Sequence, residues 1–122
     1  MILVDTSIWI DHLRQADQHL SFLLNNGHVL THPAVIGELA CGNIKNRKRF
    51  LNLISRLPHA KQATDDEVLF FIENNQLMGK GMGYIDAHLL ASTALTQSAR
   101  IFSRDKRLTK SAKALGLNVV FG

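Results

Sequence analysis

Short apolar runs alternate with amphipathic stretches along the chain, and the two kinds of segment predict strands and helices in turn. The runs of strand length lie at residues 2–4, 28–31, 100–103 and 118–121. Between them, apolar side chains recur at intervals of three and four residues, and capping residues or Pro33 stand where helices should begin. We expect helices after Asp5, over residues 17–25, 33–42 and 45–57, from residue 64 to the glycines at 79–83, and over residues 85–99 and 105–115.

This alternation predicts one domain of the α/β class. Parallel strands need crossover connections, which the intervening helices supply, so the sheet should be mostly parallel and covered on both faces. The expected architecture is a three-layer α/β/α sandwich. The 122 residues, of which 46% are hydrophobic and 20% are charged, are typical of a single domain over residues 1–122.

Charge and cysteine content narrow the class of function. Fourteen Lys and Arg against ten Asp and Glu give a formal charge of +4, which favours an anionic partner such as nucleic acid. Cys41 is the single cysteine, so an internal disulfide and a zinc cluster are excluded and a reducing compartment is expected. No apolar run reaches the roughly 20 residues of a membrane span, and the first residues lack a basic leader. We therefore expect a soluble, cytoplasmic protein.

Two acidic residues stand where expected strands end. Asp5 follows the first strand, and Asp105 follows the strand at residues 100–103. Both therefore belong to the carboxyl edge of the sheet, where open α/β folds bind ligands. Each also fits a simpler role as the capping residue of the next helix.

Two further acids lie in otherwise apolar surroundings. Glu38 is the only charged residue at positions 33–42, and a helix that is apolar all round is usually buried. Because burying an unpaired carboxylate costs several kcal/mol, Glu38 needs a cation, a proton or a gap to solvent, unless the helix is half-exposed and Glu38 faces water. Asp86 is the only acid between Glu73 and Asp105, and a favourable interaction with its helix dipole is the simpler explanation.

The four acids can meet at one edge of the sheet. In a succession of strands and helices, the helix N-termini lie beside the carboxyl ends of the strands. Four carboxylates repel one another, and an all-oxygen cluster suits Mg²⁺ or Mn²⁺ rather than zinc. The other six acids face fourteen bases, a net +8, which fits an acidic metal pocket within a rim that attracts phosphate.

The fragments that carry the four acids resemble a known family. They lie at residues 2–7 (ILVDTS), 35–39 (VIGEL), 84–91 (YIDAHLLA) and 103–108 (SRDKRL). In this order and at this chain length they resemble the PIN-domain ribonucleases, most closely the VapC toxins of bacterial and archaeal toxin–antitoxin pairs. The resemblance covers essentially the whole chain.

The resemblance implies a PIN-like sandwich and a Mg²⁺- or Mn²⁺-dependent endoribonuclease. The residues that match the acidic quartet of the family are Asp5, Glu38, Asp86 and Asp105. Thr6 and Ser103 match accessory hydroxyl positions, and Ser103 stands where many members have Thr. The resemblance also implies a homodimer and a small VapB-type antitoxin whose C-terminal segment covers the catalytic groove.

We expect the acids and the nearby bases to divide the chemistry between them. Asp5, Asp86 and Asp105 would hold one or two metal ions, whereas Glu38 would bind metal directly, bind it through water, or orient the attacking water. For contact with RNA phosphates the favoured residues are Arg104, Lys106 and Arg107, ahead of the basic cluster at positions 45–49.

Three other functions remain as alternatives. A PIN-like module would bind RNA or protein without cutting, and an RNA-processing nuclease would share the chemistry without a toxin role. A phosphotransferase of the haloacid-dehalogenase type also places Asp after its first strand. That family needs a second Asp two residues later, where this chain has Ser7.

Overall fold

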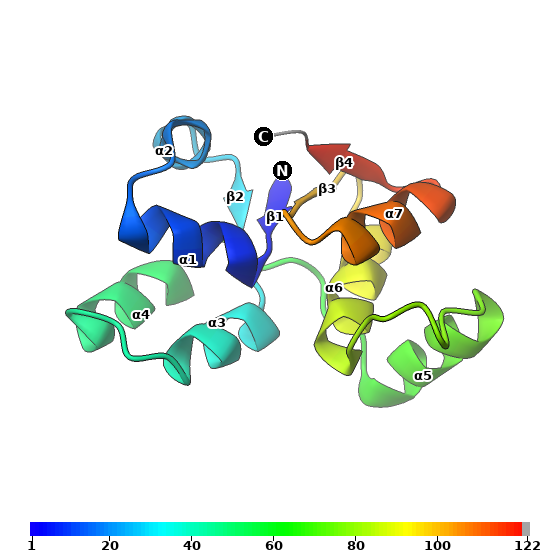
Figure 1. Cartoon of the computed structure of the whole chain (residues 1–122). Helices are drawn as coiled ribbons and strands as arrows, with labels where there is room; N and C mark the ends of the chain where they lie inside the picture. Colours follow the sequence, from blue (N-terminus) through cyan, green and yellow to red (C-terminus); the bar gives the residue numbers. More distant parts are fainter. Residues whose placement is uncertain (121–122) are drawn as a thin grey trace.

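The computed structural model describes residues 1–120, and within them a four-stranded sheet runs through the middle of the molecule (Figure 1). In spatial order the strands are β2 (Val29–Leu30), β1 (Ile2–Val4), β3 (Arg100–Phe102) and β4 (Asn118–Val120). Every neighbouring pair is parallel, as the sequence predicts. The predicted last strand extended to Phe121, which lies outside the described residues.

Seven helices connect the strands of the described part of the chain. They are α1 (Thr6–Arg14), α2 (Gln18–Asn25), α3 (Pro33–Ala40), α4 (Arg47–Ser55), α5 (Asp65–Asn74), α6 (Tyr84–Leu95) and α7 (Lys106–Ala114). In the view of Figure 1, α1 to α4 lie to the left of the centre of the sheet and α5 to α7 lie to its right. Each crossover between neighbouring parallel strands contains at least one helix, which confirms the predicted α/β class.

The central strand β1 lies in the middle of the core. Ile2, Leu3 and Val4 are all buried, at 2%, 0% and 0% exposure. Because successive side chains of a strand point to opposite faces, this pattern means that both faces of the sheet are covered. The structure thus has the three layers that the sequence predicts.

Most helix boundaries agree with the predicted ones, and the ends of α5 and α6 are the main exceptions. The helix predicted to continue to the glycines at 79–83 ends at Asn74, and Gln76 then adopts a left-handed φ of 51°. Thr64 forms a capping box with Glu67 and begins α5, as expected. The helix predicted to continue to residue 99 instead ends at Leu95. Ser98 adopts a left-handed φ of 59°, which a helix does not accommodate, and the chain then turns into β3. Among residues 1–120 the structure has no helix with the length and apolar character that crossing a membrane requires.

Candidate active site

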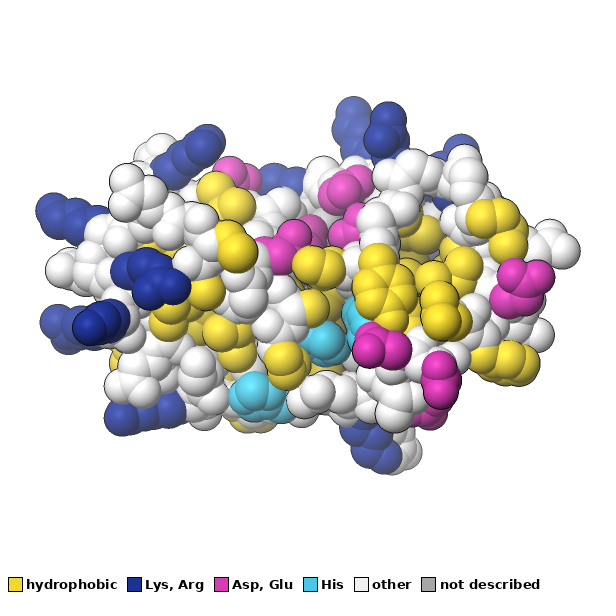
Figure 2. Space-filling view, turned by 90° about the horizontal axis from the view of Figure 1, so that it is seen from below, with side chains coloured by type: hydrophobic (Ala, Val, Ile, Leu, Met, Phe, Trp, Pro, Cys, Tyr) yellow, Lys and Arg dark blue, Asp and Glu magenta, His cyan; other side chains and the backbone are white. Residues whose placement is uncertain are grey.

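The four predicted acids approach the edge of the sheet at which β1 and β3 end. Asp5 follows β1, Asp105 follows β3, Asp86 lies in the first turn of α6, and Glu38 lies in the second half of α3. Figure 2 views the molecule from this side, where one group of Asp and Glu side chains lies near the middle of the face, others lie toward its right edge, and most Lys and Arg side chains lie at the left and upper margins. The arrangement fits an acidic pocket that is bordered by basic side chains along part of its margin.

Asp5 is the most deeply buried of the four, at 5% exposure. Its Oδ1 accepts a hydrogen bond from the backbone N–H of Thr6 at 2.7 Å. Its Oδ2 accepts from the hydroxyls of Ser7 at 2.9 Å and Ser103 at 2.7 Å. These three donors replace water around the carboxylate and fix its orientation. Sequence reasoning identified Ser103 and missed Ser7, although a hydroxyl two residues after a capping Asp is a usable signal.

Ser103 joins Asp5 to the fourth acid. Its Oγ accepts a hydrogen bond from the backbone N–H of Asp105 at 3.0 Å while it donates to Asp5. Asp105 is exposed and caps α7, with Oδ1 accepting from the N–H groups of Arg107 and Leu108 at 2.9 and 3.3 Å. The capping role and the predicted site role are therefore compatible, because capping occupies one carboxylate oxygen.

Glu38 is exposed, which agrees with the alternative of a half-exposed helix rather than with a helix that is buried all round. Only Val35 and Leu39 of α3 are buried, so one face of the helix packs inward and another meets solvent despite its apolar composition. Its Oε1 accepts a hydrogen bond from the Thr6 hydroxyl at 2.7 Å. The second predicted accessory hydroxyl thus fixes Glu38 and ties α1 to α3.

The pKa of Asp86 shows that the four acids repel one another. It is half-buried, and its Oδ2 accepts from the N–H of Gly83 at 3.2 Å. Partial burial raises the pKa of its carboxyl group above the ordinary value, and the hydrogen bond from Gly83 opposes that shift. The negative charges of the other three acids, Asp5, Asp105 and Glu38, raise the pKa further. Four separate elements therefore bring their carboxylates within electrostatic reach of one another.

The donor chemistry of this site fits a hard divalent cation. All the donors are carboxylate or hydroxyl oxygens, and a cation would relieve the repulsion felt by Asp86. Within residues 1–120, no group of three or more His, Cys, Asp or Glu side chains is already arranged to hold a metal ion. The fit is therefore one of charge and ligand type, and the assignment of Asp5, Asp86 and Asp105 as ligands stays a prediction.

The three residues predicted to contact RNA differ in whether their side chains already have partners within the protein. The Arg104 guanidinium binds Asp11 and Asp17, with both N–O distances at 2.6 Å, so it ties the end of β3 to α1 and to the start of α2. The Arg107 side chain lies against Gly81, in the loop that precedes α6, and Lys106 is exposed. Lys106 and Arg107 thus stay candidates for phosphate contact, whereas Arg104 already has two carboxylate partners.

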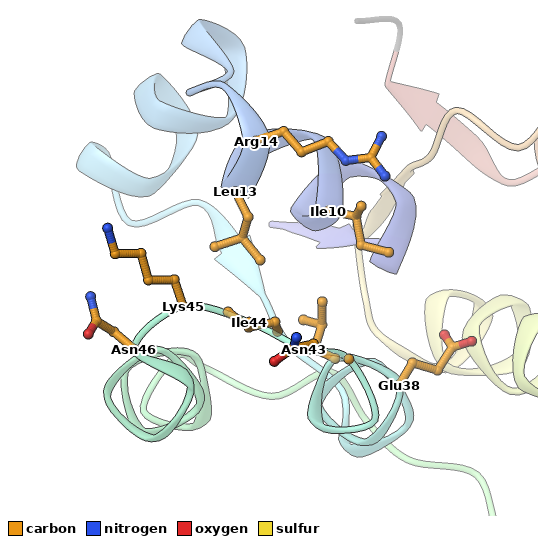
Figure 3. A pocket seen from close by; sticks show the side chains of 10 residues that line it. Ile10, Leu13, Arg14, Glu38, Asn43, Ile44, Lys45 and Asn46 are labelled. Carbon is orange, nitrogen blue, oxygen red and sulfur yellow. The ribbon is translucent and has the colours of Figure 1, made fainter.

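A groove lies beside Glu38, between α1 and the segment that joins α3 to α4. Its volume is about 520 Å³, and its lining includes Ile10, Leu13 and Ile44 as well as Arg14. Figure 3 shows Leu13 of α1 directed toward the segment that carries Ile44, with Glu38 at one end of the groove. The groove combines apolar walls with basic side chains next to the acidic site.

Comparison with known proteins agrees with the geometry. The model of the PIN domain family matches residues 2–114. Ribonuclease VapC32 of Mycobacterium tuberculosis, in two strains, is 47% identical over 117 residues, which are 96% of this chain and 94% of that protein. The crystal structure of FitAcB from Neisseria gonorrhoeae matches 99% of this chain and 97% of its own with a TM-score of 0.64, and at 19% identity this likeness supports the fold alone. The chain therefore belongs to the PIN-domain family.

Proposed function

We propose that this protein is a Mg²⁺- or Mn²⁺-dependent endoribonuclease and the toxin of a VapBC-type toxin–antitoxin pair. The observation that carries the proposal is the approach of four carboxylates from four separate elements to one edge of the sheet. The 47% identity to a protein named Ribonuclease VapC32 supports RNA as the substrate. The excess of basic residues outside the site supports the same choice.

In this mechanism Asp5, Asp86 and Asp105 would hold the metal. A Mg²⁺ or Mn²⁺ ion held there would supply acidification of a water molecule and stabilisation of negative charge on the phosphate and leaving oxygens. Ser7 and Ser103 keep the Asp5 carboxylate oriented through their hydrogen bonds to Oδ2. The Asp5 carboxylate therefore does not have to reorient when the substrate arrives.

Glu38 serves the attacking water. The Thr6 hydroxyl occupies Oε1 at 2.7 Å, and the side chain is otherwise exposed. Oε2 is then the atom that orients the attacking water and accepts its proton. Thr6 acts through Glu38 by holding the carboxylate at one edge of the site.

Lys106 and Arg107, which are exposed in the first turn of α7 directly after Asp105, contact RNA phosphates. Replacing both with Gln should weaken RNA binding and lower the slope of log affinity against log salt by roughly one for each phosphate that is no longer neutralised. Arg104→Gln is the matched control. Because the Arg104 guanidinium is paired with Asp11 and Asp17, its replacement should leave the slope unchanged. An unchanged slope in the double variant would exclude a role for Lys106 and Arg107 in phosphate binding.

The partner of the protein is a VapB-type antitoxin in the cytoplasm, and the toxin forms a homodimer. The groove beside Glu38 supports such a partner, because a segment lying in it would reach the acidic site. Expression of the chain in its native host, followed by purification and mass determination, should give a complex of a short, separately encoded protein with two copies of the toxin. A stable lone monomer would contradict this part of the proposal.

Sequencing of new RNA ends tests the activity. Purified protein, freed of any partner, is incubated with total cellular RNA and Mg²⁺ or Mn²⁺, with EDTA and Asp86→Asn as controls. Discrete ends that need metal and disappear in both controls are expected. Folded, RNA-binding protein that yields no new ends would instead favour a binding module.

A further inference from the structure

A buried histidine connects the two helices that carry Glu38 and Asp86. His32 is 4% exposed and caps the N-terminus of α3, where its Nδ1 accepts a hydrogen bond from the backbone N–H of Ala34 at 2.9 Å. Its Nε2 lies 3.0 Å from the hydroxyl of Ser92, a residue of α6 that is 0% exposed. Among residues 1–120 this is the side-chain hydrogen bond that links the start of α3 to α6.

The two bonds require one tautomer of the ring. Since Nδ1 accepts from a backbone N–H, it carries no proton, and the single proton of the neutral imidazole is on Nε2. Nε2 therefore donates to the Ser92 hydroxyl. A doubly protonated ring would place two N–H groups against each other at the cap, so the arrangement depends on a neutral His32.

The surroundings of His32 keep it neutral. Burial, and to a smaller extent the neighbouring His88 and His59, lower the pKa of His32 from 6.5 to about 4. His88 approaches from α6 with its ring centroid 6.1 Å from that of His32, and its own Nε2 lies 3.1 Å from Asp65. His59 lies on the segment that pairs with Thr31, immediately before His32. The cap is thus stable throughout the neutral pH range.

The hydrogen bond between His32 and Ser92 is the same number of residues away from each of the two acids. Glu38 follows His32 by six residues along α3, and Asp86 precedes Ser92 by six residues along α6. Six residues of helix span about 9 Å, over which a helix behaves as a rigid rod. Fixing His32 against Ser92 therefore restrains how far apart the two carboxylates lie, while Thr6 restrains Glu38 from α1.

We propose that His32 is a positioning residue, whose neutral imidazole fastens α3 to α6 through Ser92 and so sets the spacing between Glu38 and Asp86. This proposal rests on the proposed nuclease function. It predicts that weakening the link slows the chemical step without weakening RNA binding, since displacement of a catalytic group by about 1 Å can cost about 100-fold in rate.

Ser92→Ala tests the proposal, with Thr93→Val as the matched control. The Thr93 hydroxyl is also buried in α6, but it donates to the Leu89 carbonyl oxygen of the same helix at 2.8 Å. We expect Ser92→Ala to lower kcat for a mapped RNA substrate roughly 10- to 100-fold with KM within about twofold of wild type. Thr93→Val should change both constants by less than about threefold. If Ser92→Ala does not fold, Ser92→Cys replaces it as the test, since the thiol has a similar size and accepts a hydrogen bond more weakly. The loss of kcat in Ser92→Cys should be smaller than the roughly 10- to 100-fold loss expected for Ser92→Ala, and a kcat equal to that of the wild type would contradict the proposal.

A spectroscopic readout is independent of activity. In histidine-labelled protein at neutral pH, ¹⁵N NMR should find His32 protonated on Nε2 alone, and Ser92→Ala should shift that resonance while Thr93→Val leaves it in place. A doubly protonated His32, or a Ser92→Ala enzyme with the kcat of wild type, would overturn the proposal. Wild-type protein that fails to cut any RNA would overturn the nuclease function itself, so the two failures are distinguishable.

Discussion

Replacing Ser103 with Ala removes the hydrogen bond that its hydroxyl donates to the buried carboxylate of Asp5, and also the one that it accepts from the backbone N–H of Asp105. Ser103 is 8% exposed, and its Oγ lies 2.7 Å from Oδ2 of Asp5. A hydrogen bond to a charged group is worth about 1.5–3 kcal/mol. Asp5 keeps its bonds from Thr6 and Ser7, so we expect the free energy of unfolding to fall by about 2 kcal/mol.

Urea unfolding in EDTA measures this loss. With a typical dependence of about 2 kcal/mol per molar urea for a small domain, the midpoint should fall by roughly 1 M while the slope is unchanged. Ser7→Ala is the matched control, since its hydroxyl donates to the same oxygen at 2.9 Å from a less buried position. Its cost should be nearer to about 1 kcal/mol.

Two results would refute the reasoning about Asp5. A loss below about 0.5 kcal/mol in Ser103→Ala would mean that the buried carboxylate does not depend on this donor. An equal or larger loss in Ser7→Ala would mean that burial does not set the strength of the two bonds. Either result would remove the basis for treating Asp5 as a ligand that its hydrogen bonds hold in one orientation.

Three other substitutions probe the acidic edge and its surroundings. In the absence of metal at neutral pH, Asp86→Asn should raise the free energy of unfolding by up to about 1 kcal/mol, because it removes a carboxylate whose pKa is raised. The gain should vanish at low pH, where Asp86 of the wild type is itself protonated. A lower free energy of unfolding in urea titrations at neutral pH would contradict this prediction. Gly81→Ala should cost about 1–2 kcal/mol in thermal or urea unfolding, more than Gly79→Ala, since both have positive φ but only the Gly81 Cβ would meet Arg107, at 2.7 Å. As pH falls from 6.5 to about 4, the wild type should lose stability relative to His32→Asn by up to about 1.4 kcal/mol per pH unit. The reason is that His32 is protonated in the unfolded chain over this pH range but stays neutral in the folded protein. Parallel pH profiles of the free energy of unfolding would contradict this prediction.

The local pattern was sufficient to predict the fold. Strand runs such as Ile2–Val4 are apolar on both faces, and the capping box at Thr64 marks its helix by chemistry that acts within a few residues. The end of α6 was predicted too late, because no residue in its last turn is of a type that usually ends a helix. The left-handed backbone of Ser98, which ends that region, has no strong local signature.

The site was predictable where chain order determines position. Asp5 and Asp105 end neighbouring parallel strands, so topology alone brings them to one edge. For Glu38 the sequence left both a buried and a half-exposed helix open, because an apolar composition does not reveal which helix face lacks a packing partner. The pairing of Arg104 with Asp11, 93 positions earlier, was missed because it depends on where distant elements meet.

The location of bound Mn²⁺ tests the central claim most directly. In ¹⁵N-labelled protein, substoichiometric Mn²⁺ should broaden the amide resonances around Asp5, Asp86 and Asp105 first, and Asp86→Asn should abolish that selective broadening. Broadening centred on the acids at the start of α5, such as Asp65 and Asp66, with none at the edge where β1 and β3 end, would contradict the account.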